Sequence, residues 1–338
     1  MALTQKQVAR MLGLSQTTVS MALAGSPRVS PETKAAVKSL CKRLGYHPNY
    51  SATSLVNQRT RVLSVLIYPA ALQDVHARWM GTLQAESAVR GYRIRLDPPG
   101  DMARIVAERS ADGFIVFDKP ESFEEHDGTY SGMPMVFAGS PTSDGKGQLG
   151  RNTVGDDNRG AGLELVRHLG KLGHRQIAFF GLGPADRYSG DRYLGYVDGL
   201  REMGELGVEK APAVIRTPGF LKDPDMVLSY ANALQAAAAD GCTAVMATSD
   251  IMAIGCMRAL KSAGYAVPRD ISVTGFDDIV AGKVVEPPLT TMREESEVAA
   301  SAIIEMVMCL LEGKGPQQSR SVPMTLVVRG STGPAKRG

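Results

Sequence analysis

The sequence predicts a small all-α helix-turn-helix head followed by a two-lobed α/β core with parallel sheets. Three closely spaced helix-start signals occupy the first 45 residues. Beyond residue 61, short β-rich runs alternate with helical stretches, which is typical of parallel sheets covered by helices on both faces. This alternation continues along the rest of the 338-residue chain, which is long enough for two lobes.

The first helix is predicted to begin after Thr4, whose side chain suits an N-cap position. Val8, Met11 and Leu12 fall on one face of it, and Gly13 permits the left-handed turn that ends it. The predicted helix is therefore short and amphipathic.

A second helix follows at once, with Ser15 as its cap and Gly25 after its end. We expect Val19, Ala22 and Leu23 to face inward. The two helices and the glycine turn between them have the layout of a helix-turn-helix unit.

The third helix has the strongest start signal, a capping Ser30 followed by Pro31 at the first helical position and the acidic Glu32 beside the positive dipole end. Gly45 ends this helix. Three helices in about 45 residues complete the predicted head.

Charge is concentrated in the same part of the chain. Residues 1–61 hold nine Lys or Arg against Glu32 alone, a net charge of +8, so the chain's total of +3 leaves −5 for the rest. Such an imbalance indicates a polyanionic partner, with nucleic acid the leading candidate. A basic, merely solvated face is the alternative interpretation.

The uncharged segment LSQTTVSMAL, residues 14–23, suggests how that partner is recognised. The second helix of such a unit lies in the major groove with its first residues toward base edges. We expect Gln16, Thr17 and Met21 on the outward face. There glutamine can pair with adenine edges, threonine can form a hydrogen bond or contact the thymine methyl group, and methionine offers only apolar surface. A helical bundle for protein contacts is the alternative.

The segment from Thr4 to Leu55 resembles the DNA-binding headpiece of the lac repressor (LacI/GalR) family of bacterial transcription regulators. The likeness continues in the family's order through DDNRGAG, LGHRQIAFFG, RYLGY, SDIMAIGCMRAL, VPRDISVTGFDDI, PPLTTMR and LVVRGST. One departure is Met21, since the family usually has arginine after TVS; the family's usual operator is therefore not expected. The resemblance and the head's pattern together nominate DNA-contacting residues: Thr4, Ser15, Gln16, Thr17, Thr18, Ser20, Met21, Arg28, Asn49 and Leu55.

Residues 49–56, NYSATSLV, are too short to form a stable helix alone. In the family this hinge becomes helical on operator DNA, paired with its twin from a second subunit, and a leucine enters the minor groove. Leu55 occupies the matching position, and an apolar wedge of this kind bends DNA. A plain linker is the alternative.

The predicted strands and helices of the core set the domain boundaries. We expect a DNA-binding domain at 1–47, a hinge and linker at 48–61 and a two-lobed core at 62–338 that resembles the periplasmic sugar-binding proteins. Its first lobe is expected at about 62–156 and 286–318, and its second at about 157–285 and 319–332. Strands are predicted at 62–68, 92–96, 113–117, 134–138, 175–180, 243–248 and 271–276, and helices at 76–91, 158–172, 190–204, 225–240, 250–263 and 294–312.

Ligand groups are expected at the carboxyl ends of the strands, where open parallel sheets bind ligands. Asp250 and Asp277 each follow a predicted strand, and the resemblance places Arg192 and Asp157 toward the cleft between the lobes. A helix cap or an internal ion pair is the alternative role for each. Further candidates come from segments that match the family less well: Asp74, Trp79, Tyr188, Phe220 and Ser249.

Asn is usual in the family where Ser249 stands, so the effector is not assumed to be a common sugar. The sequence lacks catalytic signatures: GLGPAD at 181–186 is a poor dinucleotide motif, and the five histidines show no HExxH spacing. No enzyme activity, metal or cofactor is expected, and the four scattered cysteines suggest neither disulfides nor zinc.

Two functions remain open at this point. The first is a cytoplasmic transcription regulator, a repressor acting as a homodimer on a palindromic double-stranded DNA operator and controlled by a small ligand, a sugar or related metabolite. The second is a solute-binding protein of the same two-lobed fold. The polar amino terminus and the absence of a long apolar run favour the first and predict no membrane contact.

Overall fold

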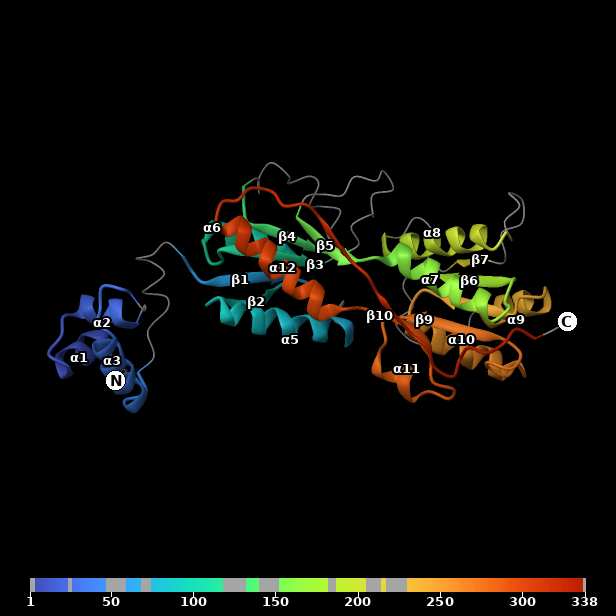
Figure 1. Cartoon of the computed structure of the whole chain (residues 1–338), viewed down its shortest axis with the longest axis horizontal. Coiled ribbons are helices and arrows are strands. Elements are labelled where there is room, and N and C mark those ends of the chain that lie inside the picture. The colour runs from blue at the N-terminus through green and yellow to red at the C-terminus, as the bar shows by residue number, and fades with distance from the viewer. Residues whose placement is uncertain are drawn as a thin grey trace. The chain divides into compact units, whose positions relative to one another are not determined.

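The computed structural model describes residues 4–23, 26–46, 59–67, 74–117, 132–139, 152–181, 187–204, 214–216 and 230–336. The chain divides into two compact units, Met1–Arg61 and Val62–Gly338. Both units are drawn in Figure 1.

The first unit, here called the head, contains the helices α1 (Gln5–Met11), α2 (Gln16–Leu23) and α3 (Pro31–Arg43). Each helix begins with a hydroxyl cap. Thr4 forms a capping box with Gln7, the Ser15 hydroxyl accepts from the Thr18 amide at 3.0 Å, and Ser30 caps α3. Local sequence therefore fixes where the helices of the head begin.

The core of the head is a small apolar cluster, in which Val8, Val19 and Val37 are fully buried. Two methionines differ from expectation. Met11 is 59% exposed, and Met21 is half-buried and packs against the cluster. The α1 and α2 helices are only about two turns long, so packing against the longer α3 decides which of their side chains turn inward.

The second unit contains two six-stranded sheets, one in each lobe. The first lobe holds the sheet β11-β5-β4-β3-β1-β2, in which all strands are parallel. The α5 and α12 helices pack on one face of this sheet and α6, which follows the short turn η2, on the other. The bounds are β1 Val62–Leu66, α5 Asp74–Val89, β2 Arg93–Asp97, η2 Pro99–Asp101, α6 Met102–Ala107, β3 Gly113–Phe117, β4 Met135–Ala138, β5 Thr153–Asp156, α12 Ser296–Leu311 and β11 Arg320–Val322.

The second lobe holds the sheet β12-β10-β9-β8-β6-β7, in which β12 alone is antiparallel to its neighbour. The α7 and α8 helices cover one face, and α9 to α11 cover the other. The bounds are α7 Asn158–Lys171, β6 Ile177–Gly181, α8 Arg187–Glu202, β7 Val214–Arg216, α9 Ala231–Ala239, β8 Ala244–Ala247, α10 Asp250–Ser262, β9 Ser272–Phe276, α11 Val280–Val284, β10 Thr290–Arg293 and β12 Thr325–Val327.

Three connections cross between the lobes. They follow Asp156 at the end of β5, Arg293 at the end of β10 and Val322 at the end of β11. The second and third crossings lie later than the boundaries expected at residues 286 and 319, because β10 pairs with β9 in the second lobe and β11 pairs with β5 in the first. Among the described residues, no helix is both long and apolar enough to span a bilayer.

Candidate functional site

The first turn of α2 presents a polar surface on the head. Gln16 and Thr17 are exposed and have no capping role, whereas Ser15 is exposed but caps the helix. Thr18 and Ser20 are half-buried. Gln16 and Thr17 therefore stand at the end of α2 that the sequence placed toward base edges.

Basic side chains are spread over the same unit. Arg28 is exposed, and Thr4, whose hydroxyl is engaged in the capping box, is exposed as well. Glu32 is the only carboxylate in the head. The other candidates, Asn49 and Leu55, lie outside the described residues. The basic side chains in the described part of the head are Lys6, Arg10, Arg28, Lys34, Lys38, Lys42, Arg43, Arg59 and Arg61.

In the core, Arg192 of α8 is almost fully buried, at 5% exposure. Its Nε donates to Asn158 Oδ1 at 2.7 Å, one terminal nitrogen donates to the Thr248 carbonyl, and its guanidinium lies 4.3 Å from the centre of the Phe276 ring. The Asp277 carboxylate lies 3.5 Å from its other terminal nitrogen. A buried cation is thus held in place by neighbours at the carboxyl ends of β8 and β9.

Asp277 directly follows β9 and has a φ of +106°, which lies in the left-handed region. Its carbonyl accepts a hydrogen bond from Arg78 of α5, so this residue joins the two lobes. Burial raises the pKa of the Asp277 carboxyl well above its ordinary value, and the charge of Arg192 opposes that rise. The strained backbone places this carboxylate beside Arg192.

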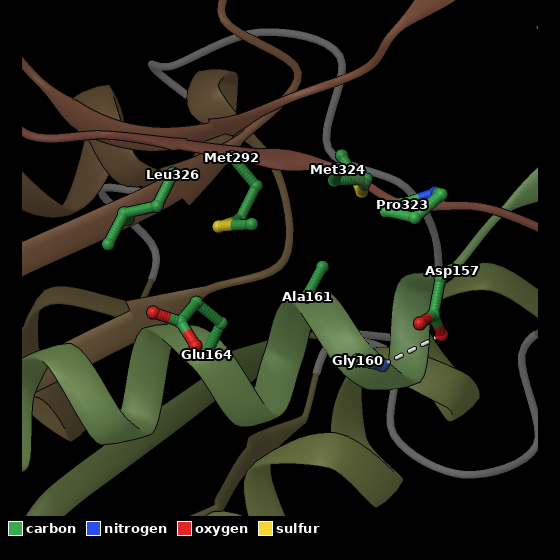
Figure 2. A pocket seen from close by; sticks show the side chains of 8 residues that line it. All are labelled: Asp157, Gly160, Ala161, Glu164, Met292, Pro323, Met324 and Leu326. Atoms are coloured by element: carbon green, nitrogen blue, oxygen red, sulfur yellow. Dashed lines mark hydrogen bonds between the residues drawn. The ribbon is translucent and has the colours of Figure 1, made fainter.

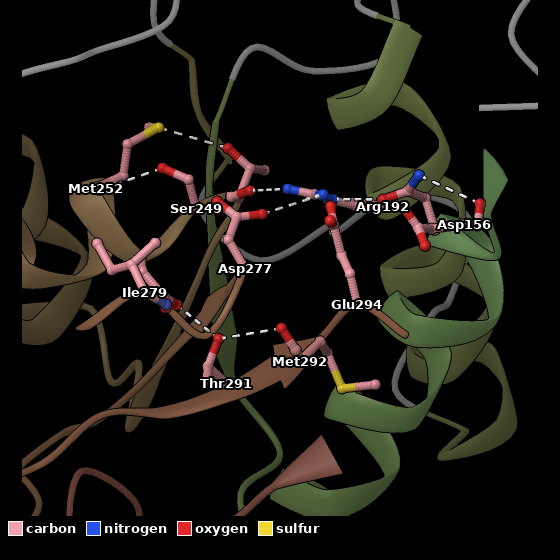
Figure 3. Close-up of polar contacts among 12 residues, drawn as sticks. Asp156, Arg192, Ser249, Met252, Asp277, Ile279, Thr291, Met292 and Glu294 are labelled. Carbon is pink, nitrogen blue, oxygen red and sulfur yellow. Dashed lines mark hydrogen bonds and ion pairs between the residues drawn. The ribbon is translucent and has the colours of Figure 1, made fainter. Parts of the chain in front are cut away.

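Two acidic residues that the sequence analysis missed complete the group. Glu294 follows β10, and its carboxylate accepts from Trp79 Nε1 at 3.1 Å. Asp156 ends β5; burial, followed by the nearby charge of Glu294, raises the pKa of its carboxyl well above the ordinary value. Figure 3 shows these acidic side chains gathered around Arg192.

Trp79 itself is 4% exposed and packs edge-to-face on Phe117 within the first lobe's core. It contributes a single indole N–H to the group through Glu294. Because β5 and β10 were not predicted as strands, the rule that ligand groups follow strand ends could not point to Asp156 or Glu294.

Three further predicted ligand residues form hydrogen bonds within the protein. Asp250 is fully buried; one oxygen accepts from the Ile279 amide at 2.9 Å and the other from the Thr291 hydroxyl. Ser249 and Asp157 cap α10 and α7. Ser249 and Asp157 accept from helix amides, those of Met252 and Gly160, and for Asp157 this is the capping role that the sequence had left open.

The remaining candidates are only partly described. Asp74 and Tyr188 lie in the first turns of α5 and α8, where the helical position alone is described, and Phe220 lies outside the described residues. Within the described ranges, no three His, Cys, Asp or Glu side chains form a group suited to a metal ion.

A cationic helix-turn-helix head joined to a two-lobed α/β core defines a class of protein, the ligand-controlled DNA-binding transcriptional regulator. Comparisons with known proteins agree. Residues 4–49 match the model of the lacI family of bacterial regulatory proteins, and residues 166–332 match the periplasmic binding protein-like domain. The chain belongs to the LacI family of bacterial regulatory proteins.

Relatives match along the full chain. The transcriptional regulator AglR of Rhizobium meliloti is 31% identical over 99% of this chain and 96% of its own length. CelR of Thermobifida fusca is 28% identical over 97% of this chain and 98% of its own length, and the structure of a CelR–cellobiose complex aligns at 26% identity with a TM-score of 0.70, covering 97% of this chain and 99% of that one. The resemblance, fold class and regulatory function expected from the sequence are confirmed.

The lac repressor dimer bound to operator and an anti-inducer aligns with a TM-score of 0.80 over 98% of this chain and all of the repressor chain. At 21% identity, that likeness concerns the fold. Because the curated relatives are transcriptional regulators with the same head, they disfavour the solute-binding alternative.

Proposed function

We propose that this regulator is a repressor that binds a palindromic operator as a homodimer, and that its effector is a sugar or a related polyhydroxylated molecule bound between the lobes. Within the head, residues 1–47 contact DNA and residues 48–61 form the hinge, and the core from residue 62 senses the effector. A twofold dimer presents two copies of α2 to the two halves of such a site.

The observation that carries the effector assignment is the buried pairing of Arg192 with Asp277. A guanidinium beside carboxylates offers fixed donors and acceptors within a small volume, and a hydroxyl group uses both at once. Glu294 and Asp156 add acceptors from the second crossing and the first lobe. The CelR complex with cellobiose supports the same class of ligand.

The regulatory step follows from where these groups lie. Arg192 and Asp277 belong to the second lobe, while Asp156 and Trp79 belong to the first. A ligand that contacts both sets binds one lobe arrangement more tightly than another, and it changes DNA affinity only through that difference. Residues 48–61 transmit the change in this proposal, with Leu55 as the minor-groove wedge.

Operator specificity departs from the family's usual pattern in this proposal. Gln16 and Thr17 remain available for base edges, but Met21 offers no bidentate donor to guanine. Its half-buried packing against the head's core supports a structural role for this position.

The test is a selection of bound duplexes from random DNA with the full-length protein, repeated with cellobiose and a panel of other sugars and metabolites. We expect an enriched palindrome whose affinity changes with at least one sugar. The absence of any preferred duplex under all conditions would refute the proposal.

The variant Asp277→Asn tests the effector site directly, because it preserves side-chain size and removes the carboxylate charge beside Arg192. We expect it to weaken the effector-dependent change in operator affinity by about tenfold, one factor of ten for about 1.4 kcal/mol of lost interaction. Asp240→Asn, at the exposed end of α9, is the matched control and should respond like the wild type.

A further inference from the structure

The three crossings between the lobes lie close together at one place in the second unit. The Asp157 amide, at the first crossing, donates to the Val322 carbonyl at the third crossing at 2.8 Å. The Thr325 hydroxyl, just after the third crossing, donates to Glu295 of the second crossing at 2.6 Å. Any relative movement of the lobes must pass through these segments.

A pocket of about 370 Å³ opens at this junction, and we call it the hinge pocket. Its volume falls within the range of small-molecule sites. All three crossings contribute to it: Asp157 follows the first, Met292 precedes the second, and Pro323 with Met324 forms the third. Its lining residues are Asp157, Gly160, Ala161, Glu164, Met292, Pro323, Met324 and Leu326.

The lining has two chemically distinct parts. Met292, Met324 and Leu326 form an apolar wall that faces α7 across the pocket (Figure 2). Met292 and Leu326 are paired neighbours on β10 and β12, so they belong to one face of the sheet. Polarizable thioethers beside an aliphatic side chain suit a flat apolar or aromatic group.

The opposite side, on α7, is acidic. Glu164 is half-buried and forms no hydrogen bond or ion pair within the residues that the structure describes, and one Asp157 oxygen accepts from the Gly160 amide. The arginines nearby on α7 form their direct ion pairs with α8, Arg159 with Asp198 and Arg167 with Glu202, although the charge of Glu164 also acts on Arg167. None of the eight lining residues is a cation.

We propose that the hinge pocket is a second ligand site, separate from the effector site, that takes a small amphipathic amine: an aromatic or aliphatic body against the methionines and an ammonium group beside Glu164 and Asp157. Such a ligand contacts all three crossings at once. Its affinity therefore depends on how the lobes are arranged, and by linkage its binding biases that arrangement.

The test measures binding of benzylamine, protonated at pH 7, to the full-length protein by ligand-observed NMR titration, with the neutral benzyl alcohol as comparison. We expect benzylamine to bind at least about tenfold more tightly than benzyl alcohol, because a charge-assisted hydrogen bond is available to one of them alone. Equal affinities for both, or no benzylamine binding at millimolar concentrations, would overturn the proposal.

Two variants locate the binding. Glu164→Gln should reduce the preference for the amine by at least about fivefold, and Met324→Trp should fill the pocket and abolish binding of both compounds. Glu297→Gln, which alters an exposed carboxylate of α12, should behave as the wild type. If both Glu164→Gln and Met324→Trp bind benzylamine with unchanged affinity, the ligand binds elsewhere and the assignment of the hinge pocket fails. This outcome does not depend on the result of the operator selection, which tests the proposed function.

Discussion

Replacing Asp250 by Asn should remove a pH dependence from the stability of the second lobe. Asp250 is fully buried, and its two oxygens accept from the Ile279 amide and the Thr291 hydroxyl. An asparagine amide fits the same space, because its oxygen can accept from Ile279 while its nitrogen donates to the Thr291 oxygen. That hydroxyl already lies 3.4 Å from the Met292 carbonyl, a second acceptor for its proton.

The size of this pH dependence follows from the raised pKa of Asp250. Burial raises the pKa of Asp250 from 3.8 to about 7, against the opposing hydrogen bond from Thr291. Between pH 3.8 and about pH 7, the folded state therefore holds a proton on Asp250 that the unfolded state has lost. The free energy of unfolding falls as the pH rises through that interval. The full rise corresponds to about 4 kcal/mol as an upper limit, at about 1.4 kcal/mol per pKa unit.

The assay is urea unfolding followed by far-ultraviolet circular dichroism between pH 5 and pH 8. Asp156 and Asp277 have raised pKa values too, so the wild type should keep part of its decline after Asp250→Asn. We expect the variant to be as stable as the wild type near pH 5 and more stable near pH 8. A variant that retains the whole decline, or that is less stable than the wild type at pH 8, would refute this account.

Asp270→Asn is the informative control. Its hydrogen bonds with Arg269, the Ala266 amide and Lys336 lower the pKa of Asp270, so this carboxylate is ionised in both folded and unfolded states across the same range. Loss of the Asp270 carboxylate should lower the free energy of unfolding by the same amount at every pH tested. The decline of that free energy with rising pH should stay unchanged.

Three further outcomes are expected. Tyr196→Phe should lower the free energy of unfolding by about 1–2 kcal/mol in urea titrations, because the buried Ile177 carbonyl loses the hydroxyl that donates to it at 2.7 Å. Ser30→Ala should lower the head's thermal stability through loss of a helix cap, by about 1 kcal/mol, whereas Ser39→Ala on the exposed side of α3 should not. Leu55→Ala should weaken binding to the selected operator in gel-shift titrations and spare nonspecific binding; equal losses in both would count against the wedge.

Local sequence patterns were enough to predict where the helices of the head begin, but not which of their side chains face inward. The caps at Thr4, Ser15 and Ser30 depend on contacts three residues away, which a sequence pattern contains. The pattern placed Met11 on the inward face and Met21 on the outward face. In the structure Met11 is exposed and Met21 packs against the head's core, because packing against the distant α3 decides these orientations. The strands β7, β11 and β12 are three residues long, too short for a periodic signal, and β5 (TVGD) and β10 (TTMR) lack the apolar run that marks the equally short β4 (MVFA) and β8 (AVMA).

The candidate site shows the same limit at the level of single residues. Asp250 and Asp277 both follow predicted strands, and nothing in the sequence separates them. In the structure, a helix starts at Asp250 and turns its carboxylate toward the Ile279 amide, while the left-handed backbone at Asp277 places its carboxylate beside Arg192. The difference arises from chain direction after the strand, which depends on long-range packing.

Asp156 and Glu294 were missed because the strands that precede the two crossings, β5 and β10, were not predicted, and their position at these crossings has a consequence for regulation. Glu294 connects β10 of the second lobe to α12 of the first, and it accepts a hydrogen bond from Trp79 of the first lobe. A residue inside one lobe responds to a ligand by moving with that lobe, whereas the charge of Glu294 acts on Asp156 of the first lobe and on Asp277 of the second, so its surroundings change when the lobes move relative to each other. Glu294→Gln keeps the acceptor for Trp79 and removes the charge beside Asp156, so it should alter the coupling between effector and operator more than it alters effector affinity itself, measured as the ratio of operator dissociation constants with and without saturating effector. An unchanged ratio would place Glu294 among the ordinary ligand contacts.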